Sequence, residues 1–374
     1  MGLRSVKVSL TGLLGILLAA PLAYAANPLQ VKTDKGKVEG AFTTDQKVRA
    51  FKGIPFAAPP VGELRWQPPQ PAAKWKGVRE AKEFGSHCIQ SSGYPDMVFH
   101  DPGASEDCLT LNVWTPAGAK GLPVMVWIYG GGFASGGTSE RRQDGQFLAH
   151  RGVVVVSMNY RLGIFGFFAH PELTAESAHH ASGNYGLMDE TAAIEWVKRN
   201  IAAFGGDPAN ITIFGESAGS FAVSAQMASP LAKGLIAKAI GESGGAFFSG
   251  GLGFPPREVQ EQKDVAFAQA AFGTSKLADL RKLSADEILK GAKAKMESPV
   301  RFGPDVDGYF LPKSVPEIYA AGEQAHVPLL SGWNADEMRA AVIFAKTQPT
   351  AESFNSQAEK DFGADAAGFL KVYP

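Results

Sequence analysis

The sequence predicts an α/β fold in which a mostly parallel central sheet is flanked by helices, with a small antiparallel portion at its amino-terminal end. Two runs, VMVWIY at residues 124–129 and VVVVSMNY at residues 153–160, are apolar throughout, as expected of strands buried on both faces of a parallel sheet. Strand-like and helix-like segments alternate after them, which favours the same class. With 374 residues, of which 45% are hydrophobic, the chain is long enough to bury a sizeable core.

Residues 1–25 are predicted to be a secretory signal peptide and not part of the fold. Arg4 and Lys7 precede an apolar run, and the tripeptide AYA at residues 23–25 provides the small residues required for cleavage. The alternative is an amino-terminal membrane anchor, but the run is short for a membrane span. We therefore expect an exported protein, periplasmic or secreted, with no membrane span in its mature chain, residues 26–374.

Composition excludes several classes of partner and site. The net charge is −1, which gives no electrostatic reason for binding nucleic acid or an anionic membrane surface. The chain has two cysteines, Cys88 and Cys108. In an exported protein we expect them to form a disulfide that closes a loop of about 20 residues and contributes about 3 kcal/mol, the alternative being two free thiols. With no histidine pair near them, they make a poor metal site, and none is predicted.

The first third of the chain is predicted to consist of strands and loops. Residues 30–58 alternate in polarity and contain turns, which indicates short antiparallel strands. The proline-rich residues 54–71 are expected to form an ordered surface loop or an extended segment. LTLNVWTP at residues 109–116 alternates as a strand and leads into the two apolar runs.

A helix, a strand and a second helix follow the apolar runs. Residues 186–206 are expected to form an amphipathic helix that ends at two glycines. The short strand NITIF, at residues 210–214, precedes an alanine-rich segment at residues 218–229 that is free of proline and is expected to be helical.

The carboxyl-terminal third begins with helices and returns to the sheet. Residues 256–295 are predicted to be helical, and Ser284 and Glu287 form the sequence pattern of a capping box. HVPLLSGWN at residues 326–334 is predicted to be another buried strand.

Two serines stand in the pattern G-x-S-x-G, Ser217 in FGESAGS and Ser243 in IGESGGA. In this pattern the serine lies on a sharp turn between a strand and a helix, which exposes its hydroxyl. A helix-forming segment follows Ser217, whereas FFSGGLGFPP, which follows Ser243, is not compatible with a helix. Ser217 is therefore the candidate nucleophile, with a structural turn serine as its alternative, and Ser243 is interpreted as a strand-end serine.

A serine hydroxyl is a weak nucleophile that needs a base, an acid to orient the base, and donors for the oxyanion. Gly130 to Gly132 follow the apolar run of residues 124–129, and glycine lets backbone N–H groups approach a substrate oxygen. The usual hole combines such a loop with the N–H of the residue after the nucleophile, here Ala218. A phosphate-binding loop is the alternative, but its glycine and lysine spacings are missing from this stretch.

Taken together, these motifs resemble those of the type-B carboxylesterases and cholinesterases of the α/β-hydrolase fold. The resemblance covers the chain from residue 30 to its end. It implies an α/β-hydrolase domain over residues 26–374, a serine carboxylic-ester hydrolase acting on a small-molecule ester, and no cofactor. The stretches that carry it are FKGIPFAAPPVGELRWQPPQP, EDCLTLNVWTP, GGGFASG, NYRLGIFGFF, GNYGLMDE, FGGDPANITIFGESAGS, VDGYFLP and GWNADE.

The resemblance also implies roles for individual residues. Ser217 corresponds to the nucleophile, and Glu337 corresponds to the acid of a Ser-Glu-His triad. The oxyanion hole is implied to consist of the N–H groups of Gly131, Gly132 and Ala218.

The position of Glu337 also fits the chemistry. It lies just beyond the predicted strand of residues 326–334, at the sheet edge where Ser217 is expected. Asp336 is the competing acid, and loop charges exposed to solvent are the alternative interpretation of both.

The sequence departs from the family's usual pattern at two positions. Met338 stands where glycine usually follows the acid, and Glu190 stands where glutamine is common; neither touches the proposed chemistry directly. Cys88 and Cys108 match the family's first disulfide.

The general base is not identified by the sequence. In this fold the triad follows the chain order serine, acid, histidine, but no histidine follows Glu337. His326, the only histidine after Ser217, lies at the start of its predicted strand, roughly 16 Å from the catalytic edge. The adjacent residues His179 and His180 would make a weak metal site. The histidines that precede the nucleophile are His87, His100, His150, His170, His179 and His180.

The sequence stops at AAGFLKVYP, within an apolar helical pattern. The resemblance implies further helices and a strand whose loop bears the histidine. We therefore expect the domain to be incomplete at its carboxyl end, and this chain to be inactive by itself.

Two other functions fit the same residues less well. A catalytically inactive relative used for adhesion or binding is one alternative, but such proteins typically lose the nucleophile, and this chain keeps Ser217, its glycines and Glu337. A serine amidase or peptidase on the same fold is the other. The sequence defines neither the ester nor the oligomeric state.

Overall fold

The structure is a computed structural model. It describes residues 1–2, 27–91, 94, 96–247, 253–295, 302–337 and 350–373. Nearly all of the predicted signal peptide and Met338 lie outside the described residues.

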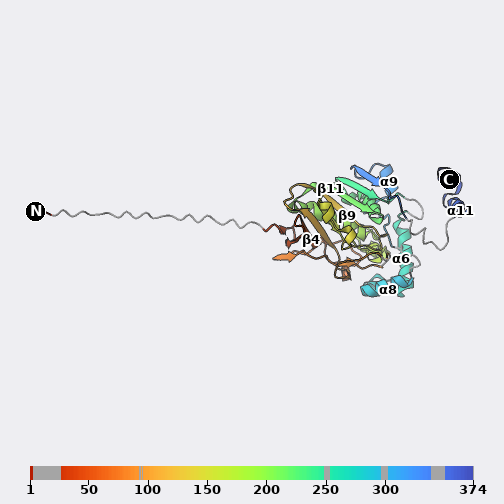
Figure 1. The fold of residues 1–374 in the computed structure, drawn as a ribbon. Helices are drawn as coiled ribbons and strands as arrows, with labels where there is room; N and C mark the ends of the chain where they lie inside the picture. The colour runs from red at the N-terminus through yellow and green to blue at the C-terminus, as the bar shows by residue number, and fades with distance from the viewer. Residues whose placement is uncertain are drawn as a thin grey trace.

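An eight-stranded sheet runs through the described part of the chain (Figure 1). Its order is β13-β12-β11-β9-β10-β8-β4-β3. The pairings from β13 to β10 are parallel, and those of β10 with β8, β8 with β4 and β4 with β3 are antiparallel. The strands are β3 (Ala41–Phe42), β4 (Val48–Pro55), β8 (Thr110–Pro116), β9 (Leu122–Ile128), β10 (Val154–Met158), β11 (Gly206–Glu216), β12 (Lys238–Glu242) and β13 (Leu329–Gly332).

Two smaller sheets lie outside the central one. The antiparallel pair expected near the amino terminus is present, since β1 pairs with β2 in antiparallel fashion, and β5 adds to β2 in parallel. A second pair, β6 with β7, joins the two ends of the loop closed by the cysteines. These strands are β1 (Gln30–Lys32), β2 (Lys37–Glu39), β5 (Val78–Glu80), β6 (His87–Cys88) and β7 (Ala104–Ser105).

The two apolar runs behave differently in the core. Every residue of β10 is buried, as predicted for a strand covered on both faces. In β9, burial alternates: Val124, Val126 and Ile128 are buried, whereas Met125 and Trp127 are only partly covered. The prediction of burial on both faces is therefore wrong for β9, because the face of the sheet that carries Met125 and Trp127 is covered incompletely. On this face the indole N–H of Trp127 donates to the side chain of Gln143.

Helices pack on the sheet, and α4 is the longest that is almost wholly buried. It ends, with the 3₁₀ turn that follows it, at Gly205, whose φ of 91° requires glycine. The predicted capping box at Ser284 and Glu287 is confirmed by both of its backbone hydrogen bonds. The α-helices are α1 (Gln146–Ala149), α2 (Gly163–Phe167), α3 (Pro171–Glu176), α4 (Tyr185–Asn200), α5 (Ala218–Ala228), α6 (Arg257–Phe272), α7 (Leu277–Leu280), α8 (Ala285–Lys295), α9 (Val315–Ala320), α11 (Ala351–Phe362) and α12 (Ala366–Val372). The 3₁₀ helices are η1 (Gly62–Leu64), η2 (Arg141–Gln143), η3 (Ile201–Phe204), η4 (Pro230–Ala232) and η6 (Gly363–Asp365).

The strand expected at residues 326–334 is present as β13, but its predicted burial is wrong. All four residues of β13 are exposed, with Leu330 at 66% and the following Trp333 at 65%. β13 is the end strand of the described sheet, so it is paired on one side only, with β12. The apolar residues therefore predicted a strand correctly, but they did not determine whether that strand is buried.

The disulfide expected between Cys88 and Cys108 is present, and both residues are buried. It closes a segment, residues 88–108, that we call the disulfide loop. Among the described helices none is long and apolar enough to span a membrane.

A group of acidic side chains, most of them buried, surrounds Asp305. This carboxyl group is fully buried, and within the described part of the chain neither of its oxygens has a hydrogen-bond partner. Burial raises the pKa of Asp305 well above its ordinary value, and the nearby carboxylates of Asp307, Asp264 and Glu261 raise it further. Arg257 acts in the opposite direction but is outweighed. The fold therefore favours the protonated, neutral form of this residue.

We expect Asp305→Asn to stabilise the chain at neutral pH, on the order of 1–3 kcal/mol, because the buried carboxyl must stay charged or take up a proton on folding, and an amide does neither. The folded-state pKa is raised, so the wild type loses stability as the pH rises from the unfolded-state pKa through the folded-state pKa. The gain should thus vanish in acid, where both states are protonated. Urea unfolding of both proteins across pH measures it. Asp286→Asn, at an exposed position on α8, is the control. Equal stabilities at neutral pH would contradict the expectation.

Candidate active site

Ser217 stands on a sharp turn between a strand and a helix. It follows β11 directly and is the N-cap residue of α5, with φ 55° and ψ −122°. Its own N–H donates to the carbonyl of Glu242 at 2.9 Å, which fixes the turn against the end of β12. A positive φ in a residue other than glycine is strained and persists where the surrounding structure enforces it. The turn has the strand–turn–helix geometry that the sequence predicted around Ser217.

The glycines on either side of Ser217 are required by packing. A Cβ on Gly219 would lie 2.1 Å from the carbonyl oxygen of Ile128, and one on Gly215 would lie 2.6 Å from the backbone of Gly219. Real Cβ contacts are essentially never this short, so a side chain on Gly219 would push α5 away from β9, and one on Gly215 would push α5 away from β11. The pattern G-x-S-x-G is therefore a steric requirement of this turn.

Ser243 also has a positive φ, 51°, but its surroundings differ. Its N–H donates to Gly332, and its hydroxyl accepts a hydrogen bond from the N–H of Asn334 at 3.0 Å. Residues 244–247, which follow it, are not helical. Ser243 thus joins the ends of β12 and β13, in agreement with its interpretation as a strand-end serine.

The glycines after β9 lie beside Ser217. We call residues 130–139 the glycine loop. A Cβ on Gly130 would lie 3.1 Å from the Cβ of Ser217. Gly131, Gly132 and Phe133 have φ values of 110°, 65° and 58°, so three consecutive residues are in a conformation that side chains disfavour. Successive N–H groups in such a turn can form a concave anion-binding site.

The turn of the glycine loop is closed by its own backbone. The Gly131 carbonyl accepts hydrogen bonds from the N–H groups of Ala134 and Ser135, at 3.1 Å and 3.0 Å. A Cβ on Gly131 would lie 2.1 Å from the Ser135 carbonyl and 3.5 Å from the terminal methyl of Met97. Met97 belongs to the disulfide loop, so this loop forms part of the surface beside the glycines.

Ala218 offers a further N–H at the same place. It is the first residue of α5, and the first N–H groups of a helix have no partner within the helix. The helix dipole also favours negative charge at this end. The structure thus brings Ser217, Gly131, Gly132 and Ala218 to one end of the parallel strands, as the sequence analysis expected.

Three glutamates gather at this edge. Glu337 lies in the turn after β13, and its carboxylate accepts a hydrogen bond from the Asn334 side chain at 3.1 Å. Partial burial raises the pKa of Glu216, and the nearby charges of Glu337 and Glu242 raise it further. Glu337 is therefore close to the residue before Ser217. Sequence reasoning missed Glu216 and Glu242, although each ends a strand immediately before a G-x-S-x-G serine.

No hydrogen bond joins Ser217 to a histidine among the described residues, which include all seven histidines. His326 contacts the carbonyl of Gly322, ahead of β13, as expected for a strand-end histidine. Most of the other rings have structural partners. His87 and His150 contact Asp101 and Asp45, His170 contacts Ser275, and His179 stacks on Tyr309. Among the described residues no group of three or more potential ligands could hold a metal ion.

A serine on a strand–turn–helix elbow, beside a glycine loop at the end of parallel strands, defines an α/β hydrolase. Solved structures have the same architecture. A PNB esterase structure superposes with a TM-score of 0.79 at 37% identity, covering 93% of this chain and 72% of its own. A Geobacillus stearothermophilus carboxylesterase superposes with a TM-score of 0.78 at 36% identity, covering 90% and 69%.

The family model described as the carboxylesterase family matches residues 27–368, so the chain belongs to the carboxylesterase family. It is 39% identical to a fumonisin B1 esterase of Sphingopyxis macrogoltabida, covering 98% of this chain and 67% of the relative. It is 42% identical to a para-nitrobenzyl esterase of Bacillus subtilis, covering 82% and 62%, and 38% identical to a mouse cholinesterase, covering 88% and 57%. The chain thus spans between 57% and 67% of the length of these relatives.

Proposed function

We propose that this chain belongs to a serine carboxylic-ester hydrolase that acts on small-molecule esters through an acyl-enzyme. The observation that carries the proposal is the strained Ser217, held between Gly215 and Gly219 beside Gly130. Membership of the carboxylesterase family, and relatives named as esterases, support ester hydrolysis.

The first half of the reaction uses groups that meet at the end of β11. The Ser217 Oγ bonds to the ester carbonyl carbon, its proton passes to a base, and the carbonyl electron pair moves onto oxygen. That oxyanion is stabilised by the N–H groups of Gly131, Gly132 and Ala218. Collapse of the intermediate expels the alcohol, which takes the proton, and leaves an acyl group on Ser217. Water then repeats these steps, releasing the acid and restoring the serine.

We assign the acid of the triad to Glu337 and the base to a histidine outside these 374 residues. Support for Glu337 comes from its position near Glu216 and from its contact with Asn334. Support for an external histidine comes from the seven histidines present, none of which is hydrogen-bonded to Ser217. The acid orients the histidine and stabilises its charged form.

The enzyme is proposed to work outside the cytoplasm, in the periplasm or as a secreted protein. The charged start, apolar run and small residues of the first 25 residues support export. A buried disulfide fits an oxidising compartment. No cofactor is needed for the proposed chemistry.

A fluorophosphonate is expected to label Ser217 and to leave Ser243 unlabelled. Such reagents bond to an activated serine hydroxyl, and the Ser243 hydroxyl is occupied by the Asn334 N–H. Mass spectrometry of the labelled peptides locates the adduct, with Ser217→Ala as the control. The protein should be this chain lengthened at its carboxyl end to include the proposed base. Labelling that survives Ser217→Ala would refute the assignment, and no labelling at all would favour an inactive binding protein.

A further inference from the structure

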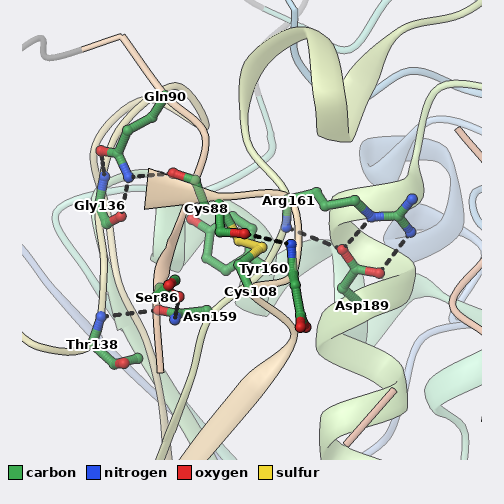
Figure 2. The surroundings of a disulfide bond; sticks show 12 residues. Ser86, Cys88, Gln90, Cys108, Gly136, Thr138, Asn159, Tyr160, Arg161 and Asp189 are labelled. Atoms are coloured by element: carbon green, nitrogen blue, oxygen red, sulfur yellow. Dashed lines mark hydrogen bonds and ion pairs between the residues drawn. A yellow bond between two sulfur atoms is a disulfide. The ribbon is translucent and has the colours of Figure 1, made fainter. Parts of the chain in front are cut away.

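The disulfide loop lies along the glycine loop and is linked to it by several side chains. Figure 2 shows Gln90, two residues after Cys88, directed at the backbone of Gly136. Nearby, Asn159 accepts from the Thr138 N–H at 3.1 Å and donates to the Ser86 carbonyl at 3.0 Å (Figure 2). The far side of the glycine loop is therefore fixed by groups next to the disulfide.

Gln90 makes the most specific of these contacts. Its Nε2 donates to the Gly136 carbonyl at 2.7 Å, and its Oε1 accepts the Gly136 N–H at 2.9 Å, so the amide satisfies both backbone groups of one residue. The same Nε2 also donates to the Cys88 carbonyl at 3.0 Å. One side chain thus connects the disulfide directly to the glycine loop.

Gly136 packs tightly against Gly130, the first residue of the glycine loop, and against Tyr129 just before it. A Cβ on Gly136 would lie 2.9 Å from the Gly130 carbonyl and 2.3 Å from the ring of Tyr129. Gly131 packs just as tightly against Ser135, the neighbour of Gly136, since a Cβ on Gly131 would lie 2.1 Å from the Ser135 carbonyl oxygen. A tightly packed turn of this kind transmits displacement, so a shift of Gly136 would also move Gly130 and Gly131.

Further contacts hold the two loops together. The Ser135 hydroxyl donates to the Ser91 carbonyl at 2.7 Å. The Ser139 hydroxyl donates to Asp101 at 2.5 Å, and the Asp101 carboxylate, whose side chain is only 1% exposed, also contacts the ring of His87 at 2.8 Å. The partners of these two serines, Ser91 and Asp101, come from the two halves of the disulfide loop. The two loops would therefore stay connected without Gln90, but the position of Gly136 depends on it.

We propose that Gln90 is a positioning residue for the oxyanion hole, and that it fixes the glycine loop by pairing with both backbone groups of Gly136. The inference rests on the proposed function, since it assigns a catalytic consequence to Gln90. Oxyanion donors act only when they are held at hydrogen-bond distance from the developing charge. Loosening Gly136 should therefore impair the transition state more than the binding of substrate.

The test replaces Gln90 with methionine, which has a similar length and volume but lacks the amide. In the lengthened chain, we expect Gln90→Met to lower kcat on the order of 10–100-fold, with KM changed by no more than about 2-fold. The control is Gln70→Ala, because Gln70 also donates to a backbone carbonyl, that of Pro68, but is exposed and remote from the glycine loop.

A thionoester separates positioning from general destabilisation. Its sulfur is a weak hydrogen-bond acceptor, so an oxyanion hole assists it little. Gln90→Met should therefore lower the ratio of oxygen-ester to thionoester turnover by about the same factor as kcat. An unchanged ratio, or a loss of kcat equal to the loss of folded protein, would overturn the proposal.

Hydrogen exchange tests the link without relying on activity. Gln90→Met should speed amide exchange in residues 130–139 and leave α5 unchanged. Absence of turnover in the wild type would refute the proposed function, but unchanged exchange in residues 130–139 would refute the role of Gln90 independently. If Gln90→Met fails to fold, Ser135→Ala, which removes the bond to Ser91, is expected to shift kcat and the ester ratio in the same direction.

Discussion

The 374-residue chain is expected to hydrolyse p-nitrophenyl acetate on the order of 10⁴-fold more slowly, or worse, than the same chain lengthened at its carboxyl end to the length of its relatives. The nucleophile, the oxyanion donors and Glu337 are present, but no described histidine is hydrogen-bonded to Ser217. Without a base the hydroxyl keeps its proton and remains a weak nucleophile. Steady-state absorbance assays on both proteins at equal folded concentration measure the difference.

His326→Ala in the lengthened chain provides the control for this comparison. His326 contacts the Gly322 carbonyl ahead of β13, so its loss should leave kcat unchanged. Equal turnover by the short and the long chain would contradict the argument. A large loss of activity in His326→Ala would identify that residue as the base.

Gly131→Ala is expected to lower kcat by about 10²–10³-fold, the effect of losing one oxyanion donor. The added Cβ would lie 2.1 Å from the Ser135 carbonyl, at a φ of 110°. The turn must therefore open, and the N–H of Gly131 must leave the position that the oxyanion requires. The measurement is kcat and KM in the lengthened chain, where KM should change little because the ground-state ester depends less on this donor.

Gly118→Ala separates backbone strain from position. Gly118 also has a positive φ, 74°, but no atom lies within 4 Å of an added Cβ. It should lose some stability to the disfavoured conformation while keeping kcat. A KM increase with unchanged kcat in Gly131→Ala would assign the glycine loop to substrate binding instead.

The elbow could be predicted because its requirements are local. A β-branched strand, two glycines and an alanine-rich helix follow one another around Ser217, and the structure has β11, the turn and α5 in that order. The capping box at Ser284 was predicted for the same reason, since a four-residue pattern determines it. The disulfide between Cys88 and Cys108 could be predicted because the chain has only these two cysteines. The catalytic roles of these site residues stay predictions.

Features that depend on distant segments could not be predicted. The acids around Asp305 come from separate stretches of the chain, so no local pattern indicates that its carboxyl group is buried without a partner. The exposure of β13 depends on what packs beside it and not on its own apolar residues. Likewise, the pairing of Gln90 with Gly136 joins residues 46 positions apart.

The packing of the elbow glycines determines where sequence libraries for directed evolution are worth making. Codons for Gly215 and Gly219 should stay fixed, because any side chain there separates α5 from β11 or β9 before it can alter selectivity. Met97 offers the opposite case, since it is a flexible, partly exposed side chain on the disulfide loop whose methyl group lies close to Gly131. Substitutions at Met97 would change the surface beside Gly131 and leave the backbone around Ser217 unchanged.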